Sequence, residues 1–161
     1  MEELHFIIRG RPTGKGRPRF ARNGHCWTPD RTVAYERDIK LAYWEAYGRR
    51  HFSADKALAV EIVLYYVRPK SMTKAKRLMA QRGILRPVVK PDIDNVAKAI
   101  LDALNGVAFP DDRQIVQLSC EKWYDVTDEN CGFASVTIKG WSMGGEGDEG
   151  YESNEKEKQN R

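Results

Sequence analysis

The sequence predicts an α/β (α+β) domain in which about four strands form a mixed sheet and about three helices pack with it. Short apolar runs rich in Val, Ile and Tyr alternate along the chain with segments whose apolar residues recur at helical spacing. A length of 161 residues is that of one domain. The composition, 41% hydrophobic and 31% charged, is ordinary for a globular protein with a core.

The chain is predicted to begin with a strand over 4–8 and a long loop over 9–30 that is rich in Gly, Pro and Arg. Connections of this length without regular structure are uncommon, so we expect the loop to be either functional or mobile. Thr32 is the predicted cap of a helix that runs to about Tyr47 and ends at Gly48. Its residues expected to face the core are Tyr35, Ile39, Ala42, Tyr43 and Ala46.

The next elements follow from the same signals. A buried central strand is expected over 57–67 and a short basic helix over 73–81, closed by Gly83. Apolar periodicity then predicts a helix over about 94–104 that stops at Gly106. Two strands, over 114–124 and 133–138, are separated by a polar turn at 125–130.

Two parts of the chain are expected to differ in order. Residues 1–141 contain all the predicted elements and form the expected domain. From residue 142 the composition is Gly, Glu, Asp, Asn and Lys with few apolar residues, which cannot offset the entropy cost of ordering. We therefore predict a disordered tail over 142–161.

Aspartates gather around the predicted helix over 94–104. Asp92 and Asp94 stand at its start, and the 107–110 loop is expected to return Asp111 or Asp112 beside them. Short carboxylates next to a lysine suit a hard divalent cation, which prefers oxygen ligands and substrate phosphate. At roughly 100° per residue, one polar face carries Asp94, Asn95, Lys98, Asp102 and Asn105.

Each of these residues also has a plain structural interpretation. An aspartate at a helix start is often a cap, Lys98 can pair with Asp94 and Asp102 at i,i+4, and an Asp-Asp pair after proline often forms a turn. Capping does not need two aspartates at i and i+2 and a second pair about one helix later. The combination therefore favours a metal site.

Positive charge is concentrated before the last twenty residues. Residues 142–161 carry six acidic and three basic side chains, so residues 1–141 carry a net charge of +7 against +4 for the whole chain. Two basic segments, 9–22 and 68–90, flank the carboxylates and suit a phosphate backbone. The alternative for the segment 68–90 is that its charges only form a solvated helix face. The predicted DNA contacts are Arg11, Lys15, Arg17, Arg19, Arg22, Lys74, Lys76, Arg77 and Lys90.

Other sequence signals indicate a cytoplasmic protein. Glu2 and Glu3 give the start of the chain the wrong charge for a secretory signal, and the longest apolar run, 57–67, is too short to span a bilayer. Cys26, Cys120 and Cys131 are odd in number and lack metal-type spacing, which argues against a disulfide framework or a structural zinc site.

The run from Lys90 to Ile115, KPDIDNVAKAILDALNGVAFPDDRQI, resembles the signature of the RusA family of Holliday-junction resolvases, small endodeoxyribonucleases common in phages and prophages. The basic run GRPTGKGRPR over 10–19 is similar to the loop after the family's first strand, so the resemblance covers most of 3–139. It implies a RusA-like fold with Asp92, Asp94 and Asp112 at the metal and Lys98 aiding catalysis. Asp111 is the alternative to Asp112.

Taken together, the residues and the resemblance predict an endonuclease that uses Mg²⁺ (or Mn²⁺) to resolve four-way DNA junctions in recombination and repair. Paired cuts on opposed strands need two such sites, so we expect a homodimer. Two alternatives come from other classes: a basic DNA-binding module without catalysis, and a metal-dependent phosphatase or nucleotide hydrolase.

Overall fold

The computed structural model describes residues 1–17, 19–20 and 26–142. Its main sheet has four strands in the order β1-β6-β4-β5. They are β1 (Glu2–Arg9), β4 (Lys56–Tyr66), β5 (Ile115–Tyr124) and β6 (Phe133–Ser142). β6 is antiparallel to β1 and β4, whereas β5 lies parallel to β4 at the sheet edge. The predicted α+β class with a mixed sheet is confirmed, and β4 lies inside the sheet as expected.

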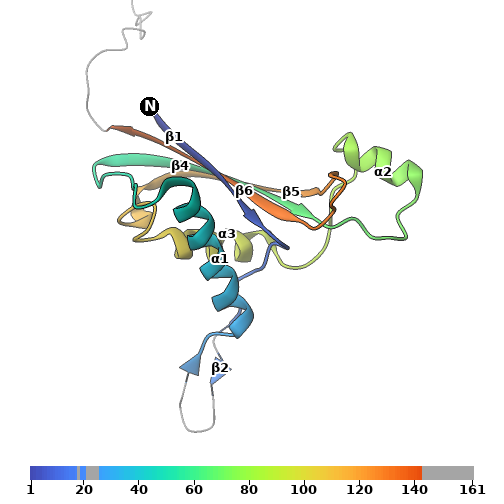
Figure 1. Ribbon diagram of the computed structural model, residues 1–161, viewed down its shortest axis with the longest axis horizontal. Coiled ribbons are helices and arrows are strands. Elements are labelled where there is room, and N and C mark those ends of the chain that lie inside the picture. The colour runs from blue at the N-terminus through green and yellow to red at the C-terminus, as the bar shows by residue number, and fades with distance from the viewer. Residues whose placement is uncertain (18, 21–25, 143–161) are drawn as a thin grey trace, which may run out of the picture.

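Helices α1 (Asp30–Tyr47) and α3 (Ile93–Leu104) cover one face of this sheet, while α2 (Lys74–Gln81) stands beyond the end of β5 (Figure 1). Thr73 caps α2 by accepting a hydrogen bond from the Lys76 amide, as the expected start of a helix at this position requires. The short strands β2 (Arg19–Phe20) and β3 (Cys26–Trp27) pair in a hairpin that projects from the body.

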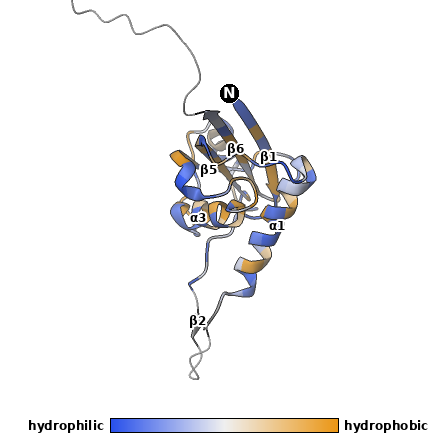
Figure 2. Cartoon of the chain, turned by 90° about the vertical axis from the view of Figure 1, so that its left-hand side faces the viewer, coloured by the Kyte–Doolittle hydropathy of each residue, from blue (hydrophilic) through white to orange (hydrophobic). Residues whose placement is uncertain are grey.

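The core lies between the sheet and the two helices. Alternation along β1 buries Leu4, Phe6 and Ile8. On α3, Val96 and Ile100 are fully buried at i,i+4 spacing, so their side chains share the face toward the sheet. Figure 2 shows hydrophilic and hydrophobic segments mixed along α1 and α3 beside the strands. Truncating Ile100 to Ala would lower the free energy of unfolding by about 2–5 kcal/mol. It would also weaken the packing that fixes which face of α3 points to solvent.

The end of α3 follows the expected signal. The helix begins one residue earlier than predicted, at Ile93, and ends at Leu104. Gly106 then adopts a φ of 73°, a conformation that glycine tolerates and that a bulky residue would resist. The chain reverses here and leads through a 3-10 helix, η1 (Asp112–Gln114), into β5.

Some boundaries differ from the predictions. Thr32 does not cap α1, which begins at Asp30 after Pro29; instead the buried Thr32 hydroxyl accepts a hydrogen bond from the Gly16 amide at 2.9 Å. The loop predicted over 9–30 contains β2 and β3. Of the α1 residues expected to face the core, Tyr35, Ile39 and Tyr43 are buried, Ala42 is partly buried and Ala46 is exposed.

β6 extends through Ser142, four residues beyond its predicted end, because its whole length pairs with β4. The rest of the predicted tail, 143–161, lies outside the described residues. In the described ranges, no helix combines the length and the apolar character that crossing a bilayer requires.

Candidate active site

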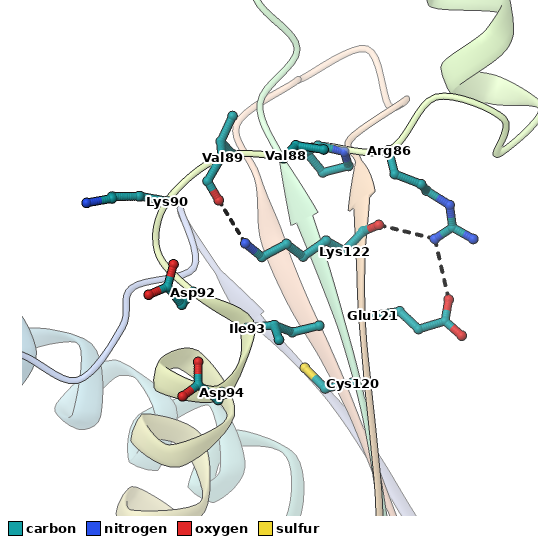
Figure 3. Close-up of a pocket in the computed structure, with 11 residues that line it drawn as sticks. Arg86, Val88, Val89, Lys90, Asp92, Ile93, Asp94, Cys120, Glu121 and Lys122 are labelled. Atoms are coloured by element: carbon teal, nitrogen blue, oxygen red, sulfur yellow. Dashed lines mark hydrogen bonds and ion pairs between the residues drawn. The ribbon is translucent and has the colours of Figure 1, made fainter.

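The N-terminus of α3 presents two aspartates to solvent. Asp92 is the residue before the helix, with extended backbone angles, and its side chain makes no capping hydrogen bond. Asp94 lies in the first turn, and both side chains are exposed. Neither carboxylate pairs with a lysine or arginine of the described chain. In Figure 3 both carboxylates lie on the outer side of this turn, while Ile93 points toward β5. The pair is therefore free to bind a ligand.

Two cavities meet at Asp92. One, of about 810 Å³, lies between the 86–94 segment and β5, with Val88, Val89 and Ile93 in its walls. The other, of about 780 Å³, has five basic residues in its lining, Arg11, Lys15, Arg17, Arg31 and Lys90. Asp92 and Lys90 belong to both. A cationic cavity beside exposed carboxylates is suited to a phosphate chain that passes the aspartates.

The basic loop reaches this place as a close-fitting strap made of Gly14, Lys15 and Gly16. The Lys15 amide donates to the Asn95 carbonyl at 3.0 Å, and the Gly16 amide bonds to Thr32. A Cβ atom on Gly14 would lie 2.9 Å from the Cβ of Pro91, closer than real contacts allow. Glycine is therefore needed for the loop to pack against the residue before Asp92.

Lys15 is the side chain that ties this strap to the helices. Its ammonium donates to the Asp102 carboxylate of α3 and lies 3.5 Å from Glu36 Oε1 on α1. The hydrogen bond with Asp102 raises the pKa of Lys15, against an opposing effect of burial. The structure thus places this predicted DNA contact in a half-buried ion pair between the loop and α3.

Lys98 lies on the exposed face of α3, one turn after Asp94. Because Asp102 is taken by Lys15, the i,i+4 pairing proposed as the structural interpretation of Lys98 is not formed. Within the described residues, Lys98 takes part in neither a hydrogen bond nor an ion pair. Its ammonium is available to a ligand at the aspartates.

The two aspartates after α3 have different surroundings. Asp111 caps η1: one of its oxygens accepts the Arg113 amide at 2.9 Å, and the other pairs with the Arg113 guanidinium at 2.9 Å. These bonds lower the pKa of Asp111. Asp112 is exposed and has no such partner among the described residues. Of the two, Asp112 is the carboxylate that remains free for a metal.

One expectation about this site is wrong for the single chain. The 107–110 loop does not return Asp111 or Asp112 beside Asp92 and Asp94, and the described residues contain no group of three acidic, His or Cys side chains able to hold a metal. α3 is 12 residues, or about 18 Å, long; Asp92 and Asp94 stand at its start, whereas the turn that leads to Asp111 and Asp112 leaves from its other end.

The other predicted DNA contacts fall into two groups. Arg11, Arg17 and Lys90 are exposed around the basic cavity. Lys74, Lys76 and Arg77 are exposed on α2, beyond the end of β5 (Figure 1). Arg19 lies in β2, and Arg22 is outside the described residues.

Two basic residues of the site were missed by sequence reasoning. Arg31 lines the basic cavity from the first turn of α1, where a positive charge opposes the helix dipole, and that misplaced charge was a usable signal. Lys122 of β5 lines the apolar cavity and donates to the carbonyl oxygens of Val89 and Pro91 (Figure 3). Because its partners are backbone atoms, no sequence pattern marks it.

Free aspartates beside cationic walls are typical of the enzymes that hydrolyse phosphodiesters. Comparison with known proteins agrees with this class. The family model described as endodeoxyribonuclease RusA matches residues 9–130. The uncharacterized protein YqaN of Bacillus subtilis (strain 168) is 33% identical over 129 residues, which cover 77% of this chain and 89% of that protein. The chain belongs to the RusA endodeoxyribonuclease family, as the resemblance predicted.

Proposed function

We propose that this protein is a divalent-metal-dependent endonuclease that resolves four-way DNA junctions with paired cuts, acting as a homodimer. The observation that carries the proposal is the Asp92–Asp94 pair: two exposed carboxylates without protein partners in the described chain, at a helix N-terminus and at the meeting point of two cavities. Membership of an endodeoxyribonuclease family makes DNA the substrate and weighs against a purely DNA-binding module.

The donor set fits Mg²⁺ (or Mn²⁺), because magnesium is commonly held by one or two carboxylates together with substrate phosphate. Asp92 and Asp94 are the residues that would hold it, with Asp112 as the third candidate. When bound, the ion would polarise the scissile phosphate and lower the pKa of an attacking water.

The remaining side chains would then act on the DNA. Arg11, Arg17, Arg31 and Lys90 would hold the phosphates next to the cleaved one in the basic cavity. Lys98, free on the same face of α3, would stabilise the negative charge that develops on the phosphate in the transition state.

A homodimer offers a way to bring Asp112 into the site. β5 is an edge strand, and its Val116 and Leu118 are 64% and 47% exposed, which a monomer usually avoids on a sheet edge. If a two-fold axis perpendicular to β5 related two copies across this edge, their β5 strands would run antiparallel. Asp112, just before β5 of one copy, would then approach the Cys120 and Lys122 end of the other, where Asp92 and Asp94 lie.

The test offers three labelled substrates, a synthetic four-way junction, linear duplex and a free nucleotide, each with Mg²⁺ and with EDTA. We expect two symmetric cuts in the junction with Mg²⁺ only. Binding of the junction without cleavage would favour the DNA-binding module, and release of phosphate from the nucleotide alone would favour the hydrolase alternative.

A further inference from the structure

Lys122 makes an unusual set of contacts for a lysine on a strand. Its Nζ donates to the carbonyl oxygen of Val89 at 2.7 Å and to that of Pro91 at 2.6 Å, and it lies 5.4 Å from the centre of the Tyr66 ring. Within the described residues it forms no salt bridge with an acid. Its ammonium instead makes charge-assisted hydrogen bonds to backbone carbonyls that are more than thirty residues away in sequence.

The bonded carbonyls belong to the short segment that carries Asp92. Residues 87–91 have no regular secondary structure. Within the described chain, the hydrogen bonds of this segment come from Lys122. The neighbouring Arg86 does not hold the segment, because its guanidinium bonds to the carbonyls of Gly83 and Lys122. Side-chain packing holds the middle of the segment poorly, because Val88 is 96% and Val89 43% exposed.

Figure 3 shows how the connection is made: Lys122 reaches from β5 across the cavity to Val89, above Ile93 and the start of α3. On the opposite side, Pro91 is packed against the Gly14 strap. The turn before Asp92 is therefore held between the strap on one side and the Lys122 ammonium on the other. Asp92 itself makes no capping bond, so the direction of its carboxylate depends on this backbone.

We propose that Lys122 is a positioning residue for the carboxylate site: by bridging the carbonyls of Val89 and Pro91, it fixes the backbone that aims Asp92. This inference rests on the proposed metal-dependent function. Groups that orient metal ligands without touching the metal commonly change metal affinity or activity about 10–100-fold when removed. The hydrogen bonds of Lys122 go to the carbonyls of Val89 and Pro91 and not to Asp92, so its effect on that carboxylate passes through the main chain.

The test compares Lys122→Met, which keeps the length and removes the donors, with Lys122→Arg, which keeps donors and charge. Lys139→Met is the matched control, because Lys139 lies on β6 and pairs loosely with Glu3 at 3.7 Å. Single-turnover junction cleavage is measured over a Mg²⁺ series. We expect Lys122→Met to raise the Mg²⁺ concentration for half-maximal rate about tenfold or more, with partial recovery in Lys122→Arg and no change in the control.

Two further measurements separate positioning from loss of DNA contact or of folding. Junction affinity in EDTA should stay within about twofold of wild type, since a lost phosphate contact would weaken it and reduce its salt dependence. Hydrogen exchange by mass spectrometry should show faster exchange in the peptide that covers 92–99, where the Val96 amide bonds to the Asp92 carbonyl, and unchanged exchange in β1 and β6. If Lys122→Met does not fold, the Mg²⁺ series and the exchange of Lys122→Arg decide in its place.

Wild-type Mg²⁺ dependence in Lys122→Met, or unchanged exchange over 92–99, would overturn the positioning role while leaving the proposed function intact. Failure of the wild-type protein to cleave a junction with Mg²⁺ would overturn the proposed function itself. In that case the exchange measurement still decides whether Lys122 holds the segment.

Discussion

Lys15 and Asp102 are joined by an ion pair that connects the basic loop to the polar face of α3, and Glu36 of α1 lies beside the same ammonium. Both partners are about one-third exposed, at 32% and 33%. Three segments that are distant in sequence meet at this pair, on the face of α3 that also carries Asp94 and Lys98. The loop is thereby set against the active-site helix, which leaves Arg11 and Arg17 to face the basic cavity.

Lys15 and Arg17 should therefore behave differently. Arg17→Ala removes a phosphate contact, so the log–log salt slope of DNA binding should fall by roughly one unit. Lys15→Met should leave that slope nearly unchanged, because Asp102 already neutralises its charge. Titration of binding from low to moderate salt measures both, and equal slope losses would return Lys15 to the DNA interface.

The same ion pair should contribute to stability. Lys15→Met is expected to lower the free energy of unfolding by about 1 kcal/mol at neutral pH. The folded state raises the pKa of Lys15 above its ordinary 10.5, so the contribution is complete below pH 10.5 and is lost as pH rises through the folded-state pKa. Urea unfolding of wild type and Lys15→Met at pH 7 and above pH 10.5 checks this: the gap should narrow at the higher pH, and a gap that widens would contradict the ion pair.

The free carboxylates lead to a third prediction. Asp92→Asn or Asp94→Asn removes ligand charge and also removes repulsion of phosphate, so cleavage should fall by orders of magnitude while junction affinity in EDTA holds or rises. Melting temperature should change little, since neither side chain caps α3. A parallel loss of cleavage, binding and stability would indicate a structural role.

The sequence predicts most of the fold because local signals agree with the tertiary contacts. The helix over 94–104 and the strands of the sheet follow from periodicity, since one face of each element is buried. Thr32 was misread because its hydroxyl is used by Gly16 from the distant loop, and the sequence around Thr32 contains nothing about that contact. Its correct reading needs the folded chain.

The places of the candidate site residues on α3 were predicted well, but their arrangement with Asp112 was predicted less well. Asp92, Asp94 and Lys98 lie at the start and on the polar face of α3, as helical spacing requires. The distance from Asp92 and Asp94 to Asp112 depends on the path of the whole helix and on the turn at Gly106. The number of residues between them in the sequence does not fix that distance. Lys15 was assigned to DNA because a charge pattern does not reveal that Asp102 lies within reach.

Cys120 provides a test of the apolar cavity's wall. Burial raises the pKa of its thiol from 9.0 to about 11, because the thiolate is poorly solvated there. The reactive thiolate fraction should therefore keep rising up to about pH 11, and alkylation of Cys120 by iodoacetamide should not level off near pH 9. Peptide mapping by mass spectrometry follows it, with the exposed Cys131 as the internal control. Levelling near pH 9 would mean that the wall opens to solvent.

Lys98 has a catalytic and a merely solvated interpretation. If it meets the developing charge at the phosphate, Lys98→Ala should lose about 2.7–4 kcal/mol of transition-state stabilisation, a rate loss of roughly a hundredfold to a thousandfold. Lys98→Arg should recover little, since a planar guanidinium differs in shape from an ammonium. Single-turnover junction cleavage at saturating enzyme measures the rate. An unchanged rate in Lys98→Ala, with an unchanged melting temperature, would remove Lys98 from catalysis.

Asp112 can be assigned to its own or a second copy's site by mixing two inactive variants. Asp94→Asn chains alone and Asp112→Asn chains alone would each form inactive dimers. In a mixed dimer with sites shared between copies, one site carries both substitutions and the other carries none, so cleavage of one strand should return to roughly half of the wild-type rate per dimer. If Asp112 acts beside Asp94 of its own chain, every site in the mixture holds a substitution, and mixing restores no activity.

The two outcomes are distinguished by a nicking assay on a labelled junction, using mixed dimers that are purified after co-expression with two different tags. The matched control mixes Asp111→Asn with Asp94→Asn, because Asp111 is engaged in capping η1.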